Sequence, residues 1–156
     1  MKGKTCIVTG ANSGIGRATA LGLATRGAHV IMACRDIHRS AAAQEAIKRE
    51  SGSDLVDLME LDLSSMENIR SFAKLFLDKY DRLDVLLNNA AVVPNIRKVT
   101  EDGYEAQIGV NHLGHFLLTN LLTYFTHLTR FSSDCGGPVV EALDDVDHDA
   151  RAVHRL

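Results

Sequence analysis

The sequence predicts an α/β protein built around a doubly wound parallel sheet, and three observations support this fold class. An apolar β-type run at residues 6–8 stops at a glycine-rich turn, and a helical pattern starts at once. Short apolar runs then alternate with helical patterns from residue 29 to residue 87. Strands separated by helices form right-handed crossovers, which make the sheet parallel. Polar residues follow the runs and fall at the carboxyl ends of the strands, where such sheets bind ligands, at residues 34–36, 62 and 88–91.

The glycine-rich turn is the stretch Gly10-Ala11-Asn12-Ser13-Gly14-Ile15-Gly16. Gly10 permits a tight turn that a side chain would obstruct. Gly14 lets the backbone approach a ligand, and Gly16 lets the following helix lie close to the strand. The exposed amides at the helix start then form a site for a pyrophosphate. A tight turn without a ligand is the alternative interpretation of this spacing.

The other elements are predicted from periodicity and from residues that start or stop helices. Gly27 is expected to end the first helix, and Ser64 and Glu67 form the pattern of a capping box. Behind that box, apolar residues keep the rhythm of a buried helical face, namely Ile69, Phe72, Ala73, Phe76, Leu77 and Tyr80. The expected strands after residue 10 cover 29–33, 55–61 and 85–87, and the expected helices cover 15–26, 38–50, 64–80 and 104 to about 130.

Length and composition indicate one globular domain followed by an acidic tail. The chain has 156 residues, of which 46% are hydrophobic and 24% charged, with a net charge of −3. Residues 131–156 hold six acids against two arginines, a net −4, so residues 1–130 carry +1. We therefore expect a folded domain over 1–130 and a disordered acidic tail over 131–156. Neither charge balance suggests a nucleic-acid partner.

Cysteine usage and hydropathy bear on the compartment. Cys6, Cys34 and Cys135 are odd in number and far apart, which argues against disulfides and favours a reducing compartment. No signal peptide precedes the first strand, and no apolar run reaches the length of a membrane span. We expect a soluble chain, located in the cytoplasm or in a compartment that the sequence does not identify.

Two patterns resemble metal sites, but neither is complete. His112 and His115 lie three apart on one predicted helix without a third ligand, so packing is the better explanation. Residues 145–149 (Asp-x-Asp-x-Asp) resemble the opening of a calcium loop, yet Ala150 and Leu156 stand where Gly and Glu are needed. No metal is predicted.

Taken together, the motifs resemble those of the classical short-chain dehydrogenases/reductases, most closely the retinol-dehydrogenase-like branch. The resemblance covers residues 1 to about 122 and then stops, as after a frameshift or a missed splice. It implies the N-terminal part of a Rossmann-like sheet with strand order 3-2-1-4. It also implies hydride transfer between a nicotinamide cofactor and an alcohol or carbonyl, possible substrates being retinoid-like or otherwise lipophilic. The matching motifs are Thr9-Gly10-Ala-Asn-Ser-Gly14-Ile-Gly16, Ala33-Cys-Arg-Asp36, Leu61-Asp62-Leu63, Asn88-Asn-Ala90 and Asn111-His-Leu-Gly-His115.

The resemblance also implies where a dinucleotide binds. Asp62 resembles the family's adenine-contacting aspartate, and Asn88 and Ala90 resemble the residues that flank the ribose. Ala91 departs from the family's usual glycine, which places a methyl group on the nicotinamide side. The residues that resemble the pyrophosphate loop are Gly10, Asn12, Ser13, Gly14, Ile15 and Gly16.

Two residues after the second strand favour NADP over NAD. Members that prefer NAD usually place an acid at the position of Cys34, where a carboxylate would repel a phosphate. Arg35 beside it offers the fork-shaped donor that suits an adenosine 2′-phosphate. A solvated surface charge is the alternative interpretation of Arg35.

The catalytic residues implied by the resemblance are incomplete. Asn111 resembles the asparagine that holds a water in the family's proton relay, whose other members are a serine and a Tyr-x-x-x-Lys pair. No lysine follows any tyrosine at that spacing, because the residues four after Tyr80, Tyr104 and Tyr124 are Asp84, Ile108 and Leu128. Three interpretations stay open: an oxidoreductase by descent, an inactive cofactor- or partner-binding module, and a by-product without function.

Self-association is a further expectation. The family's sheet continues beyond the fourth strand, and no fifth strand is recognisable after residue 122. An uncovered apolar edge tends to pair with other chains. We therefore expect the chain to be aggregation-prone, loosely folded or dependent on a partner, such as a second copy packed along the long helix.

Overall fold

A computed structural model describes the backbone of residues 1–132 and the side chains of residues 1–123. The contacts divide the chain into a unit Met1–Leu122 and a unit Thr123–Leu156. The first unit contains the sheet and all the side-chain contacts described below. Nearly all of the expected acidic tail, from residue 133 on, lies outside the described residues.

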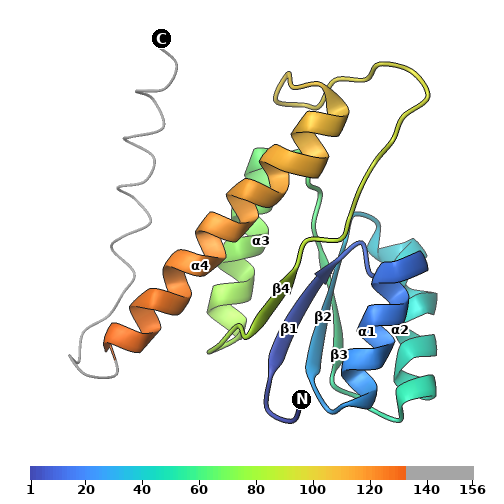
Figure 1. The fold of residues 1–156 in the computed structure, drawn as a ribbon, viewed down its shortest axis with the longest axis vertical. Coiled ribbons are helices and arrows are strands. Elements are labelled where there is room, and N and C mark those ends of the chain that lie inside the picture. Colours follow the sequence, from blue (N-terminus) through green and yellow to red (C-terminus); the bar gives the residue numbers. More distant parts are fainter. Residues whose placement is uncertain (133–156) are drawn as a thin grey trace. The chain divides into compact units, whose positions relative to one another are not determined.

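The sheet has four parallel strands in the order β3-β2-β1-β4, which confirms the predicted fold class and strand order (Figure 1). Ile7 in the middle of β1 pairs with Ile31 on β2 and with Leu86 on β4, so β1 is a central strand. All five residues of β1 are buried. The strands are β1 (Thr5–Thr9), β2 (His29–Cys34), β3 (Val56–Glu60) and β4 (Val85–Leu87).

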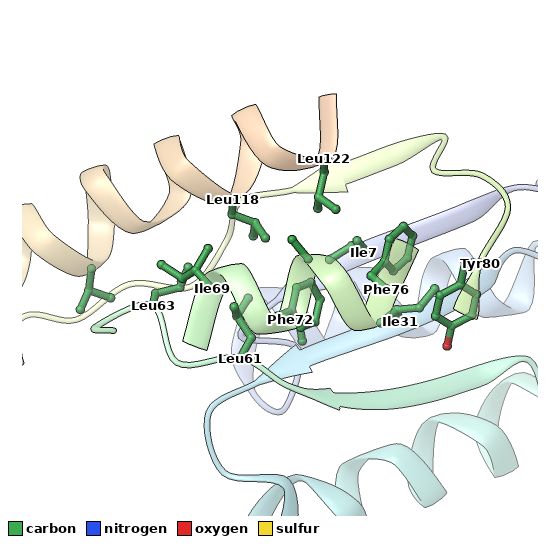
Figure 2. Close-up of a cluster of buried hydrophobic side chains, with 13 residues drawn as sticks. Ile7, Ile31, Leu61, Leu63, Ile69, Phe72, Phe76, Tyr80, Leu118 and Leu122 are labelled. Carbon is green, nitrogen blue, oxygen red and sulfur yellow. The ribbon is translucent and has the colours of Figure 1, made fainter. Parts of the chain in front are cut away.

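Successive strand residues point to opposite sides of the sheet. Both faces of this sheet are apolar, and helices cover both of them. Cys6 and Val8 on one face pack with helices α1 (Gly14–Thr25) and α2 (Ile37–Ser51). On the other face, the side chains around Ile7 pack against α3 (Met66–Lys79) and the first turns of α4 (His115–Ser132). Figure 2 shows this second cluster, in which Phe72 and Phe76 of α3 and Leu118 and Leu122 of α4 take part.

The expected helix from Tyr104 begins later and is irregular. Val99 and Glu105 form an antiparallel bridge, and the helix starts at residue 106. The Glu105 carboxylate accepts hydrogen bonds from the amides of Gln107 and Ile108, both at 3.1 Å, so it caps the helix instead of entering it. The prediction placed Tyr104 inside the helix and was wrong by two residues, about half a turn.

A π-helix, η1 (Ile108–Gly114), precedes α4, and glycines near its two ends let it pack closely. A Cβ on Gly114 would lie 2.6 Å from the Leu63 carbonyl oxygen, and one on Gly109 would lie 2.6 Å from Thr100 Cγ2. Sequence periodicity did not predict this segment. Single-turn π segments occur frequently at functional sites.

The capping of α3 also differs from the expected box. Ser65, not Ser64, accepts from the N3 amide, that of Asn68. Ser64 instead donates its hydroxyl to Asp62, at 2.7 Å. Asp102 of a distant loop completes the cap, because its carboxylate accepts from the Met66 amide at 2.8 Å.

The carboxylate of Asp57 ties two strands to the end of α3, and this cluster yields a stability prediction. Its Oδ2 accepts from Tyr80 Oη, from Lys79 Nζ at 3.2 Å and lies 3.1 Å from His29 Nε2. Burial, reinforced by Asp57, raises the pKa of Tyr80 to about 12. Tyr80→Phe should lower the free energy of unfolding at pH 7 by about 1.5–3 kcal/mol, because one hydrogen bond to a charged group is lost.

The pH dependence of that difference follows from the raised pKa. The Tyr80 contribution is fully present below the unfolded-state pKa of about 10 and is lost as pH rises towards 12. Urea unfolding of the wild type, Tyr80→Phe and the exposed control Tyr104→Phe at pH 7 and pH 11 measures it. A Tyr80→Phe difference that does not shrink at pH 11 would contradict the assignment.

None of the helices in the described part of the chain combines the length and the hydropathy that a membrane span requires.

Candidate functional site

A cleft of about 590 Å³ lies at the carboxyl edge of the sheet. Its volume falls within the range of small-molecule and cofactor sites. Its walls come from the glycine-rich turn, the end of β2, the segment after β3, the loop after β4 and η1. The lining residues are Gly10, Asn12, Ser13, Gly14, Ile15, Gly16, Ala33, Cys34, Arg35, Asp36, Arg39, Leu61, Asp62, Leu63, Asn89, Ala90, Ala91, Val92 and Val110.

The three glycines of the turn have distinct geometric roles. Gly10 has φ +65° and a Cβ there would lie 3.0 Å from Ala90 Cα, so the turn touches the loop after β4. Gly14 has φ +53° and open space where a side chain would stand. A Cβ on Gly16 would lie 2.4 Å from the Gly10 carbonyl oxygen. The first turn of α1 therefore packs directly on the glycine turn.

The amino terminus of α1 is open towards this cleft. Ser13 occupies the N-cap position, but its side chain makes no capping hydrogen bond. By contrast, Asp36 caps α2 and Ser65 caps α3. The first turn of α1 also carries no acid. Free amides and the positive end of the helix dipole together favour an anion at this place.

Two arginines stand at the end of the cleft that β2 and α2 form. Arg35 and Arg39 both line the cleft and are exposed. Within the described part of the chain, neither guanidinium forms an ion pair. The sequence analysis did not identify Arg39, because Arg35 precedes α2 and its N-cap Asp36, so helical spacing gives no signal that links the two arginines.

Cys34 beside them is 3% exposed. The Ser40 side chain and the backbone of Ala11 and Asn12 act on the thiol to lower its pKa, but their effect is smaller than that of burial. Burial nevertheless raises the pKa of Cys34, so the thiol is neutral near pH 7. The position therefore contributes no negative charge to the cleft.

Asp62 also lines the cleft, just after β3. Its Oδ1 accepts from the Ser64 amide at 2.8 Å and from the Ser64 hydroxyl at 2.7 Å. The backbone amide of Asp62 donates to Asn68 Oδ1 at 2.7 Å. These bonds fix the orientation of the Asp62 carboxylate in the wall of the cleft.

The loop after β4 contributes Asn89 and Ala90, whereas Asn88 is not among the lining residues. Asn88 is exposed and donates its amide to Thr119 Oγ1 at 2.9 Å. The side-chain amide of Asn89 donates through Nδ2 to the Thr9 carbonyl oxygen at 2.9 Å. The expected ribose contact of Asn88 stays a prediction. The sequence analysis did not identify Asn89, because two identical adjacent residues give no sign of which one faces the ligand edge.

Asn111 lies in η1 and fixes the backbone of Val92. Its Nδ2 donates to the Val92 carbonyl oxygen at 2.9 Å, and its Oδ1 accepts from the Val92 amide at 2.8 Å. Asn111 itself does not line the cleft, whereas Val92 does. Its amide therefore shapes the cleft through Val92, and its expected part in a proton relay stays a prediction.

Across the residues that the structure describes, no group of three or more His, Cys, Asp or Glu side chains is arranged to hold a metal ion.

An open α/β sheet with a glycine turn and an uncapped helix start at its carboxyl edge is typical of a Rossmann-type domain. A family model described as short chain dehydrogenase matches residues 4–140. The chain belongs to the short chain dehydrogenase family, as its motifs predicted.

Among curated proteins, the chain is related to retinol dehydrogenases. It is 53% identical over 120 residues to human retinol dehydrogenase 13, which covers 77% of this chain and 36% of that protein. It is 51% identical over 132 residues to mouse retinol dehydrogenase 14, a match that covers 78% of this chain and 40% of that protein. The chain thus spans 36% to 40% of the length of these relatives.

Solved structures share the fold. A metagenomic short-chain oxidoreductase in complex with NADP aligns with a TM-score of 0.70 and 31% identity, covering 80% of this chain and 57% of that one. An uncharacterised protein from Mycobacterium paratuberculosis aligns with a TM-score of 0.69 and 46% identity. This alignment covers 79% of this chain and 42% of that one.

Proposed function

We propose that the chain binds NADP(H) in the cleft and that Arg35 and Arg39 hold the adenosine 2′-phosphate. The observation that carries this proposal is the pair of guanidiniums without ion-pair partners among the described residues, beside a neutral thiol at Cys34. Arginine forks suit phosphate oxygens, whereas a carboxylate at the thiol position would repel them. The NADP complex of a structural relative supports the same cofactor.

The remaining residues of the cleft fit the other parts of this cofactor. The uncapped amides at the start of α1 suit the pyrophosphate, and the open space at Gly14 admits its oxygens. Asp62 offers an acceptor for the adenine end, and Ala90 borders the ribose. When bound, NADP(H) supplies the hydride in reactions of this family.

For the whole protein, we infer an oxidoreductase that acts on a lipophilic or retinoid-like alcohol or carbonyl. The names of its curated relatives, retinol dehydrogenases 13 and 14, support this substrate class. The 156 residues in hand favour a second function, an inactive cofactor-binding module, because they contain no Tyr-x-x-x-Lys pair. Asn111 then serves as the support of Val92.

Arg35→Leu tests the cofactor assignment. We expect this variant to bind NADP⁺ between tenfold and a hundredfold more weakly, about 1.5–3 kcal/mol for one charge-assisted contact, and to bind NAD⁺ as the wild type does. Arg49→Leu is the matched control, since Arg49 is an exposed arginine of α2 outside the cleft. Calorimetric titration measures all affinities. Equal loss for NADP⁺ and NAD⁺, or loss in the control, would contradict the assignment.

We also propose self-association through the face next to β4. In the described sheet β4 is an edge strand, and Phe116 on the adjoining helix is 62% exposed. Phe116→Glu should shift the chain towards monomer in size-exclusion chromatography with light scattering. Leu75→Glu on α3, where the side chain is 61% exposed, should not. A monomeric wild type would contradict this proposal.

A further inference from the structure

Thr9 and His115 form a buried polar pair behind the cleft. Thr9 ends β1 with no exposed surface, and His115 begins α4 with 7% of its surface exposed. Thr9 Oγ1 and His115 Nε2 are 3.0 Å apart. On its other side, His115 Nδ1 lies 3.2 Å from the Asn111 carbonyl oxygen. The imidazole therefore connects the start of the glycine turn to η1.

The hydrogen bonds around Thr9 leave two possible acceptors for its hydroxyl proton. A hydroxyl has one proton and two acceptor lone pairs. The backbone amides of Asn89 and Ala90 both donate to Thr9 Oγ1 at 2.9 Å, which occupies both lone pairs. The proton then goes either to His115 Nε2 at 3.0 Å or to the Leu87 carbonyl oxygen at 3.3 Å.

The surroundings of the imidazole decide between these acceptors. The Asn111 carbonyl can only accept, so His115 Nδ1 carries a proton. Burial lowers the pKa of His115, which leaves the ring neutral and Nε2 an acceptor. Thr9 therefore donates to His115. The opposite tautomer would direct a third donor at the Thr9 hydroxyl and place a lone pair against the Asn111 carbonyl.

We propose that His115 is a positioning residue for the cofactor cleft, because it orients the Thr9 hydroxyl that holds the Asn89–Ala90 loop. This inference rests on the proposed binding of NADP(H). The loop and the glycine turn already touch at Ala90 and Gly10, and both line the cleft. A loop that is no longer held at Thr9 changes the wall of the cleft directly.

Titration of the full 156-residue chain with NADP⁺ tests this role. His115→Leu fills the space without an acceptor and is expected to weaken binding about tenfold, the effect of one hydrogen bond. Adding His115→Leu to Thr9→Val should cost no further affinity, because both changes remove the same bond. His115→Gln, which returns an acceptor oxygen, should restore most of the affinity. His112→Leu, at an exposed histidine three residues earlier, should bind as the wild type does.

Nitrogen-15 NMR of the cofactor-free chain gives a second, independent result. We expect the Nδ1–H tautomer of His115. The Nε2–H tautomer, or a folded His115→Leu variant with wild-type affinity, would overturn the proposal. If His115→Leu does not fold, the test rests on two results: the tautomer of His115 in the wild type and the NADP⁺ affinity of His115→Gln. The Nε2–H tautomer, or a His115→Gln variant that does not retain most of the affinity, would overturn the proposal. A wild type that shows the Nδ1–H tautomer but does not bind NADP⁺ would overturn the proposed function, and with it the cofactor role of His115, while the hydrogen-bond assignment would stand.

Discussion

The 156-residue chain is expected to reduce retinal with NADPH no faster than the background reaction. None of its three tyrosines is followed by lysine at the spacing of the family's acid–base pair. Without that pair, the chain lacks the tyrosine that donates the proton to the forming alkoxide in the family and the lysine that lowers the pKa of that tyrosine. Proton transfer by a positioned side chain contributes about 10²–10⁴-fold by itself. Loss of substrate orientation lowers the rate further.

A spectrophotometric assay at the NADPH absorbance, with a full-length retinol dehydrogenase as positive control, measures this rate. Asn111→Ala is the diagnostic variant, because Asn111 is the one residue of the chain that resembles a member of the family's catalytic set. A rate comparable with the positive control that Asn111→Ala abolishes would show that a different acid operates in this chain.

Two glycines of α1 are expected to respond oppositely to the same substitution. Gly16→Ala places a methyl group 2.4 Å from the Gly10 carbonyl oxygen, so α1 and the glycine turn must separate. Overpacking of this kind costs about 1–3 kcal/mol, and we expect NADP⁺ affinity to fall more than a hundredfold because the phosphate site itself moves. Gly22→Ala meets only Arg26 Nη1, the flexible end of a side chain, at 3.3 Å.

Because Gly22 lies in a helix interior, alanine there should stabilise the chain by about 0.5–1 kcal/mol and leave NADP⁺ affinity unchanged. Thermal melting and calorimetry on both variants make the comparison. A stable Gly16→Ala variant with normal affinity would mean that the contact between α1 and the glycine turn does not shape the phosphate site.

The parts of the fold that sequence predicted well are those that a strong local pattern determines. The strand at Val85–Leu87 has the same bounds in the prediction and in the structure. The buried positions Ile69, Phe72 and Phe76 of α3 followed from helical periodicity. Apolar spacing reports which face of an element is buried and so locates strands and helices along the chain, whereas the strand order 3-2-1-4 was implied by the family resemblance.

The features that sequence did not predict depend on competition between neighbouring polar groups. Ser64 binds Asp62, so the cap of α3 moves to Ser65. Glu105 caps the helix that was expected to contain it. At the cleft, Asn89 and not the adjacent Asn88 is a lining residue. Arg39 lines the cleft because α2 places it there. Such choices are made by tertiary contacts, which local patterns do not carry.

The central claim is that the cleft selects NADP(H) through Arg35 beside an uncharged Cys34. Isothermal titration of the wild-type chain with NADP⁺ and, separately, with NAD⁺ tests it most directly. We expect NADP⁺ to bind about tenfold to a hundredfold more tightly, as one charge-assisted phosphate contact requires. Equal affinities, or tighter binding of NAD⁺, would contradict the account.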